Sequence, residues 1–178
     1  MIEFLNPDAD VGIENTPYDL SVKVDGGNAT TIGLLANGFP DSVPFLDEVG
    51  KAVSRLRPGI NLKAYNKGNA TIAAPEKLLG EIGGDCVGVI AACRHGGSCT
   101  TGTVRDGINL AKLGIPSVAL VTEEFWAQGD FVAESLGMAD VPRVQLPHPV
   151  AGTGSENMTA VADSVAQEIV AALEASSD

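Results

Sequence analysis

The sequence predicts a three-layer α/β fold, in which one parallel sheet lies between two layers of helices. Short, almost wholly apolar runs such as TTIGLLAN (residues 30–37) are typical of strands that are covered on both faces. Longer segments alternate with these runs, and their apolar residues recur at helical spacing, as Phe45, Val49 and Val53 do. This alternation within 178 residues indicates a single domain with a proper core.

The elements follow one another regularly after a loop-like start. Residues 1–29 are interpreted as an N-terminal arm or extension, within which DLSVKVD (residues 19–25) is compatible with a short edge strand. Residues 30–178 are expected to form the α/β domain. The expected strands are residues 30–37, 60–66, 86–93, 116–122 and 143–147. The expected helices are residues 41–57, 74–84, 99–114, 123–138 and 157–175.

The strand order expected for this sheet is 2-1-3-4-5, as in flavodoxin-like folds, because right-handed crossovers leave few alternatives at this size. Ligands of such sheets bind beyond the carboxyl ends of the strands, near the point where the strand order reverses. The segments that reach this edge are NGFPDS, CRHGGSCTTG, TEEFW and PHPVAGTGS. Topology alone therefore places the candidate functional residues there.

The charge of the chain excludes some classes of partner. Asp and Glu number 23 against 11 Lys and Arg, which gives a formal net charge of −12. Phosphate binding needs a basic patch, so we expect neither nucleic acid nor an anionic membrane as a partner. There is no apolar run of membrane-spanning length, and the first residues do not resemble a signal peptide. We therefore expect a cytoplasmic protein with reduced thiols.

The three cysteines differ in their expected positions. Cys86 opens the third strand, far from the functional edge, and is interpreted as a small, inert, buried residue. Cys93 closes the same strand at the edge. Cys99 begins the next helix, where free N–H groups and the positive end of the helix dipole stabilise a thiolate. A cysteine that merely begins a helix fits the pattern as well, but the position at the edge favours function.

The loop around Cys99 carries further candidates for catalysis and binding. Arg94 and His95 add positive charge near the thiol, so Cys99 is a candidate nucleophile or thiol acid/base and His95 a candidate proton carrier. Glycines that lead into a helix bind anions through their backbone. We expect an anionic substrate group to be bound by Arg94, Gly97, Ser98 and Thr100.

Three other segments supply candidates at the same edge. His148 lies between two prolines after the fifth strand, which suits either a rigid general acid or base or a rigid surface turn. Glu123 ends the fourth strand and either orients a histidine or caps the next helix. Asn37, after the first strand, is a candidate ligand contact. Asp106 lies about two helical turns after Cys99 and is expected to be structural, for example in a salt bridge.

Other chemistries have weaker signals in this sequence. A metal site would use Cys93, His95, Cys99 and His148, but this spacing is not a standard zinc pattern and no C-x2-C is present. A flavin is disfavoured because its phosphate loop would follow the first strand and few aromatic residues are available for stacking. The G-x-G-x-x-G fingerprint of dinucleotide binding is absent. We therefore predict no cofactor and no metal.

Four separated motifs resemble the UGSC family, a group of small proteins and selenoproteins. They are NGFP, GGSCT with the following RDG, LAKLGIPSVALVTEEF and LPHP, and the resemblance runs from about residue 30 to the last helix. The family is named for selenocysteine or cysteine followed by Gly, Ser and Cys. The resemblance therefore implies thiol or selenol redox chemistry, with the two chalcogens three residues apart.

This chain departs from that motif at its first position. Gly96 stands where the family has selenocysteine or cysteine, and only Gly97, Ser98 and Cys99 of the motif remain. A dithiol cycle that uses this pair cannot run here. Cys93 is the candidate resolving thiol in its place.

Three hypotheses follow from these patterns. The first is a small-molecule enzyme that uses Cys99 on a carbonyl or carboxylate substrate, in lyase, hydrolase or transferase chemistry. The second is a thiol oxidoreductase that uses Cys99 with Cys93 or with an external thiol. The third is a non-catalytic subunit or binding module. We also expect a homo-oligomer or association with a related subunit.

Overall fold

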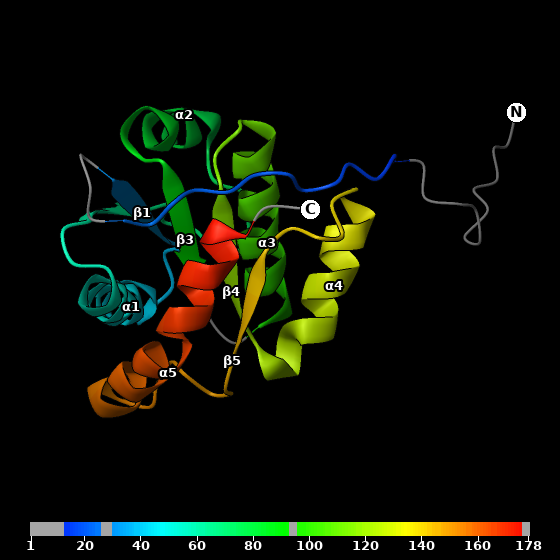
Figure 1. The fold of residues 1–178 in the computed structure, drawn as a ribbon. Coiled ribbons are helices and arrows are strands. Elements are labelled where there is room, and N and C mark those ends of the chain that lie inside the picture. Colours follow the sequence, from blue (N-terminus) through cyan, green and yellow to red (C-terminus); the bar gives the residue numbers. More distant parts are fainter. Residues whose placement is uncertain (1–12, 26–29, 93–95, 176–178) are drawn as a thin grey trace, which may run out of the picture.

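The computed structural model describes residues 13–25, 30–92 and 96–175, which form a five-stranded parallel sheet with helices on both faces (Figure 1). The strand order is β2-β1-β3-β4-β5, as the sequence predicts, and the fold is flavodoxin-like. The strands are β1 (Thr31–Ala36), β2 (Asn61–Asn66), β3 (Gly88–Ala92), β4 (Ser117–Thr122) and β5 (Arg143–Leu146).

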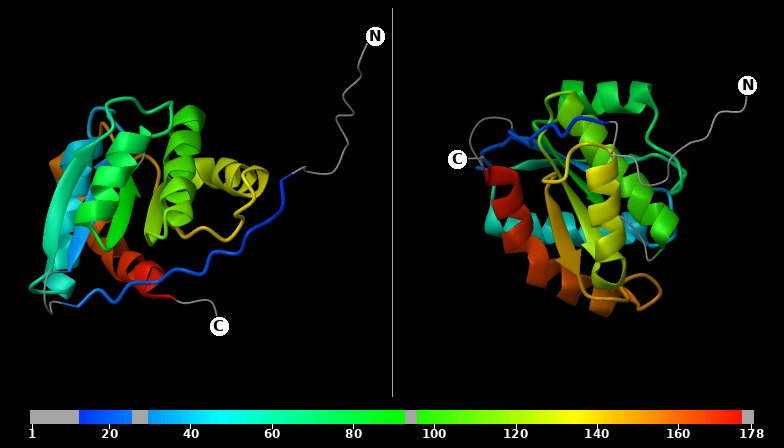
Figure 2. Two further views of the ribbon diagram at one scale, coloured as in Figure 1. Left: turned by 90° about the horizontal axis from the view of Figure 1, so that it is seen from above. Right: turned by 90° about the vertical axis from the view of Figure 1, so that its right-hand side faces the viewer.

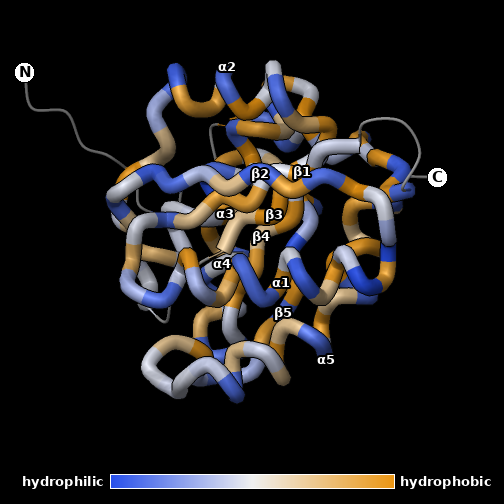
Figure 3. Tube along the Cα trace, turned by 90° about the vertical axis from the view of Figure 1, so that its left-hand side faces the viewer, coloured by the Kyte–Doolittle hydropathy of each residue, from blue (hydrophilic) through white to orange (hydrophobic). Residues whose placement is uncertain are grey.

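The helices cover the sheet in two layers (Figure 2). They are α1 (Ser42–Leu56), α2 (Glu76–Asp85), α3 (Gly97–Lys112), α4 (Trp126–Ser135) and α5 (Ser155–Glu174), with a short 3-10 helix η1 (Glu123–Phe125) before α4. α1 and α5 pack together on one face, whereas α2, α3 and α4 cover the other. β2 is an edge strand and lies between α2 and α1 in Figure 3.

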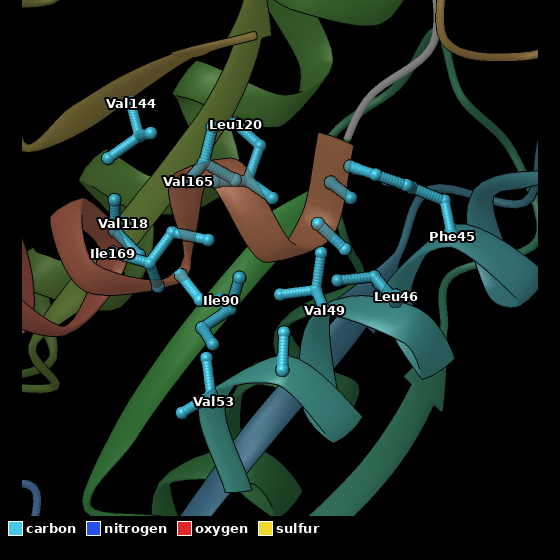
Figure 4. Packing of buried hydrophobic residues seen from close by; sticks show 14 of the residues in the cluster. Phe45, Leu46, Val49, Val53, Ile90, Val118, Leu120, Val144, Val165 and Ile169 are labelled. Atoms are coloured by element: carbon cyan, nitrogen blue, oxygen red, sulfur yellow. The ribbon is translucent and has the colours of Figure 1, made fainter. Parts of the chain in front are cut away.

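The largest apolar cluster lies between the sheet and the layer of α1 and α5 (Figure 4). Phe45, Val49 and Val53 of α1 are buried in it, as their spacing predicts. They meet Ile90 of β3 and Ile169 of α5. Because this face is filled by apolar side chains, the polar residues of interest lie at the ends of the strands.

Most element boundaries shift by one or two residues from the sequence prediction, and two differences near the candidate site matter most. α3 begins at Gly97 and not at Cys99, because the Gly96 carbonyl already accepts the Thr100 N–H at 3.0 Å. The single helix expected over residues 123–138 is divided into η1 and α4. The first of these differences places Cys99 in the third position of its helix.

The interpretation of residues 19–25 as an edge strand is wrong. The segment 13–25 runs past the amino-terminal edge of the sheet without regular strand pairing. Isolated contacts hold it: the Ser117 N–H donates to the Tyr18 hydroxyl at 2.9 Å, and the Val22 N–H donates to the Leu173 carbonyl at 2.8 Å. Val22 thus bonds to the end of α5, where no neighbouring strand is available.

Candidate functional site

The loops at the carboxyl edge of the sheet are joined to one another. The Gly152 N–H, after β5, donates to Asp41 Oδ2, after β1, at 2.8 Å. Asp41 has a positive φ of 69°, a conformation that aspartate tolerates better than most residues. The loops after β1 and β5 are therefore held together at this edge.

The first turn of α3 carries four of the predicted site residues: Gly97, Ser98, Cys99 and Thr100. The N–H groups at the start of a helix have no partner within the helix, and the helix dipole favours negative charge there. The Cys99 side chain is buried, with 4% of the residue exposed, whereas Ser98 is exposed. Cys99 is a free cysteine. The thiol therefore lies beneath the surface at the end of α3 that suits an anion.

Three buried side chains at this edge have polar atoms that find no hydrogen-bond partner among the described residues: Asn37 Nδ2, Thr100 Oγ1 and Thr103 Oγ1. Asn37 is 1% exposed, and its Oδ1 accepts the Phe39 N–H at 3.0 Å, so its amide group is free to donate. Buried polar groups are nearly always paired in native proteins, so such atoms point to a ligand or an ordered water.

Strand alternation relates Asn37 to the threonines. Asn37 lies two positions after Leu35, so the two residues share one face of the sheet. Leu35 packs in one cluster with Leu110 of α3. Thr103 precedes Leu110 by about two helical turns, and α3 returns antiparallel to the strands. Asn37 and Thr103 are therefore displaced from that cluster in the same direction, toward the carboxyl edge. The sequence analysis did not single out Thr103, because a threonine within a helix has no distinctive pattern.

Glu123 and His148, both predicted to lie at this edge, are brought together. The His148 N–H donates to Glu123 Oε1 at 3.1 Å, and His148 Nδ1 lies 3.3 Å from the Thr122 hydroxyl. The ring of Phe125 lies against the imidazole, with 5.9 Å between the ring centroids. The peptide bond between His148 and Pro149 is cis. Glu123 thus fixes the histidine through its backbone, and Thr122 contacts its ring.

Cys99 follows β3, whereas Glu123 and His148 follow β4 and β5. Within the described residues, no hydrogen bond joins the thiol to either of them. Cys93, Arg94 and His95 lie outside the described residues, so the roles of these three stay predictions. No group of three or more His, Cys, Asp and Glu residues that could hold a metal occurs among the described residues.

A buried ion pair between Asp106 and Lys67, a residue that the sequence analysis did not single out, holds the loop after β2. Lys67 Nζ donates to Asp106 Oδ2 at 2.6 Å and to the Ile72 carbonyl at 2.7 Å, and the Ala74 N–H donates to Asp106 Oδ1. The side chains are 1% and 2% exposed. Burial raises the pKa of the Asp106 carboxyl, against the opposing attraction of Lys67. The prediction of a structural salt bridge for Asp106 is confirmed.

Cys86 is buried, as predicted, but lies just after α2 and before β3. Its sulfur is 3.6 Å from the Tyr65 hydroxyl. Burial raises the pKa of the Cys86 thiol, which makes it a poor nucleophile. Of the two described thiols, Cys99 is therefore the candidate for chemistry.

The sequence matches the model of the UGSC family over residues 5–175, which is nearly the whole chain. The chain belongs to the UGSC family. Gly96 occupies the first position of the motif, and its φ of 165° is extended backbone that any residue can adopt. A Cβ placed there would lie 3.8 Å from the Cys99 sulfur and, apart from its chain neighbours, within 4 Å of no other described residue. Sterics therefore do not explain why this UGSC protein has glycine there.

Comparisons with other proteins give only distant likenesses. No curated protein matches the chain. A diflavin flavoprotein A3 from Nostoc sp. is 10% identical over 82% of this chain and 96% of its own, with a TM-score of 0.44. A flavodoxin-like domain from Synechococcus sp. is 10% identical over 79% of this chain and 97% of its own, with a TM-score of 0.34. At these scores neither likeness bears on ligands or activity.

No helix within residues 13–25, 30–92 and 96–175 combines the length and the apolar character that crossing a bilayer requires.

Proposed function

We propose that this UGSC protein is a small-molecule enzyme that uses Cys99 on a carbonyl or carboxylate substrate bound at the carboxyl edge of the sheet. One observation carries the proposal: Asn37 and Thr100 are buried at this edge, and each keeps a polar atom without a partner. Donors of this kind can bind the oxygens of a carboxylate, together with the N–H groups at the start of α3. Cys99 stands in the same turn of that helix.

The chemistry of the site follows from the properties of a thiol. A base takes the proton of Cys99, the sulfur forms a bond to the carbonyl carbon, and the C=O π electrons move onto the oxygen. N–H and O–H donors directed at that oxygen stabilise the negative charge. His148 is the candidate proton carrier among the described residues, and Glu123 holds its backbone. The substrate would lie between the thiol and the imidazole.

Two alkylating probes test the thiol and the anion site together. Iodoacetate carries a carboxylate and iodoacetamide does not. The rate of labelling by iodoacetate divided by the rate of labelling by iodoacetamide therefore reports whether the surroundings of a thiol attract or repel an anion. We expect this ratio at Cys99, measured by peptide mapping, to exceed the ratio for uncharged N-acetylcysteinamide. Without an anion site, the net charge of −12 would repel iodoacetate and lower the ratio.

A matched pair of variants sharpens this experiment. Thr100→Val removes the unpartnered hydroxyl with little change of shape, and we expect it to lower the ratio at Cys99. Ser135→Ala removes a hydroxyl from the end of α4 and should leave the ratio unchanged. A ratio at Cys99 below that of the free thiol would refute the anion site. A Cys99 that neither probe labels would refute the enzyme proposal and leave a binding or subunit role.

The thiol oxidoreductase stays as a second candidate because of one observation. A Cβ at position 96 would lie 3.8 Å from the Cys99 sulfur, so the position of the family's first chalcogen adjoins this thiol, and an external thiol would take its place there. Oxidised glutathione would then give a mixed disulfide at Cys99 and release one reduced glutathione. Peptide mapping that finds only free Cys99 thiol after this treatment would contradict the second candidate. Gly96→Cys is the positive control, because it restores the family pair and should form a 96–99 disulfide.

A further inference from the structure

One edge of the sheet is open to an added strand. β2 is the edge strand, and of its six residues only Tyr65 is buried. The Asn61 N–H donates to the Thr30 carbonyl, and the Lys67 N–H donates to the Ala36 carbonyl. Because these groups alternate along a strand, Leu62, Ala64 and Asn66 direct their backbone N–H and C=O groups away from β1. Such an edge pairs readily with another strand.

An apolar groove runs beside this edge, between β2 and α1. It consists of two adjoining cavities of about 550 and 270 Å³ that share Leu34, Asp47 and Ala64. Leu62 of β2 is 36% exposed, and Val43 of α1 is 39% exposed. Large apolar side chains gathered beside an unpaired strand are typical of an interaction surface.

The charges along the groove are complementary to a second copy of the same surface. Asp47, Lys51 and Arg55 follow one another at intervals of four residues on the side of α1 that lines the groove. A twofold axis at the strand edge makes the two α1 helices neighbours and antiparallel. Asp47 of each copy then lies toward Arg55 of the other. Lys51, near the axis, is already paired with Glu48 at 2.6 Å.

We propose that two copies of this chain associate through β2 and α1, with the two β2 strands antiparallel across a twofold axis. The outward backbone groups fix the register: Ala64 pairs with Ala64 of the second copy, and Leu62 pairs with Asn66. Both sheets then join into one continuous sheet. Neighbouring strands lie about 4.8 Å apart, which brings the two grooves next to each other. The proposal does not depend on the activity of Cys99.

Sedimentation analysis of the full chain over a concentration series tests the association. We expect a dimer for the wild type and a monomer for Leu62→Lys, because the added ammonium lies in the groove beside Lys51 and Arg55. Leu113→Lys is the matched control, since Leu113 is also exposed but follows α3, away from β2. Circular dichroism verifies that each variant is folded. A monomeric wild type, or a Leu62→Lys dimer as stable as the wild type, would overturn the proposal.

A cross-link tests the register without weakening the interface. Residues in a hydrogen-bonded antiparallel pair have Cα atoms about 5.5 Å apart, within the range that a disulfide spans. Ala64→Cys should therefore give a covalent dimer on mild oxidation, whereas Leu113→Cys should not. The wild type, oxidised in parallel, shows what the native cysteines contribute. Absence of the Ala64→Cys cross-link in a protein that is dimeric would contradict the twofold register.

Discussion

Two clusters of buried polar groups lie at the carboxyl edge of the sheet, and they differ in how their hydrogen bonds are satisfied. In the first, Lys67 and Asp106 bind each other and two backbone groups of the loop after β2. In the second, Asn37, Thr100 and Thr103 each keep one polar atom without a partner. Burial is almost complete in both clusters, so solvent exposure does not account for the difference.

The difference separates a structural role from a binding role. A satisfied buried ion pair costs a great deal to break but offers nothing to a ligand. An unsatisfied buried donor carries an energetic penalty that a ligand or a water can remove. The first cluster should therefore govern stability and the second should govern binding, and substitutions in each can test this division.

The largest effect is expected from breaking the ion pair. Lys67→Met leaves the Asp106 carboxylate buried without its cation, and we expect the free energy of unfolding to fall by roughly 3–5 kcal/mol. Chemical denaturation at neutral pH measures this change. Replacing both partners, as in Lys67→Met with Asp106→Leu, should recover part of the loss, because no charge is then left unpaired.

An exposed ion pair serves as the control for that prediction. Lys63 and Asp85 lie 2.6 Å apart, but both side chains are more than a third exposed. Lys63→Met should leave the free energy of unfolding nearly unchanged, because solvent screens an exposed ion pair. Equal losses in Lys67→Met and Lys63→Met would contradict the structural role of the buried pair.

The close approach of the β2 loop to α3 gives the next largest effect. A Cβ at Gly102 would lie only 2.5 Å from the Ala70 carbonyl oxygen, so Gly102→Ala must push the loop away. We expect a loss of roughly 1–3 kcal/mol in chemical denaturation. Gly84→Ala in α2 meets no atom within 4 Å and should instead stabilise the protein by about 0.5–1 kcal/mol. If Gly102→Ala and Gly84→Ala changed the free energy of unfolding in the same direction, the close packing at Gly102 would be refuted.

The pH dependence of stability should reveal the buried carboxyl. Burial raises the pKa of Asp106 above the usual 3.8, so between these two values the folded state binds more protons than the unfolded state. This contribution to stability is complete below pH 3.8 and is lost as the pH rises through the folded-state pKa. The free energy of unfolding of the wild type, relative to Asp106→Asn, should therefore rise as the pH falls through this window.

Other carboxyl groups have the opposite effect on the pH dependence of stability, and their contribution cancels when Asp106→Asn is compared with the wild type. Glu48 and Asp85 have lowered pKa values, caused first by their lysine partners. Their contribution to the stability of the folded state is therefore lost on acidification, in both proteins. Lys67 and Arg105 are the cations that face Asp106, and both lower the pKa of its carboxyl against the effect of burial. A difference between the two proteins that does not vary with pH would show that the Asp106 carboxyl titrates as it does in the unfolded chain.

The fold could be predicted from the sequence more fully than the site. Apolar runs and helical spacing are local patterns, and they locate all five strands and predict their order. Lys67 was missed because its partner lies 39 positions away, and no local pattern marks such a contact. The unpartnered atoms of Asn37 and Thr103 are equally invisible in the sequence, since burial arises from packing in three dimensions. Glu123 and His148 were predicted to lie at the same edge because they follow neighbouring strands, but the bond from the His148 backbone to Glu123 was not predicted.

The smallest expected effect is also the most informative about the site. Thr100→Val removes a buried hydroxyl that makes no hydrogen bond, so the free energy of unfolding should stay within about 0.5 kcal/mol of the wild type or rise slightly. Ser117→Ala is the control, because its buried hydroxyl donates to the Gly107 carbonyl at 3.0 Å, and it should cost about 1 kcal/mol. Denaturation of both variants measures the two values.

A loss for Thr100→Val as large as that for Ser117→Ala would mean that an ordered water satisfies the Thr100 hydroxyl in solution. The second cluster would then resemble the first, with stability as its role. If Thr100→Val leaves the free energy of unfolding unchanged but lowers the preference of Cys99 for iodoacetate, then Thr100 contributes to binding and not to stability. Selection for stability alone does not retain a hydroxyl that contributes nothing to folding but assists the binding of an anion, so that result would assign Thr100 to the ligand.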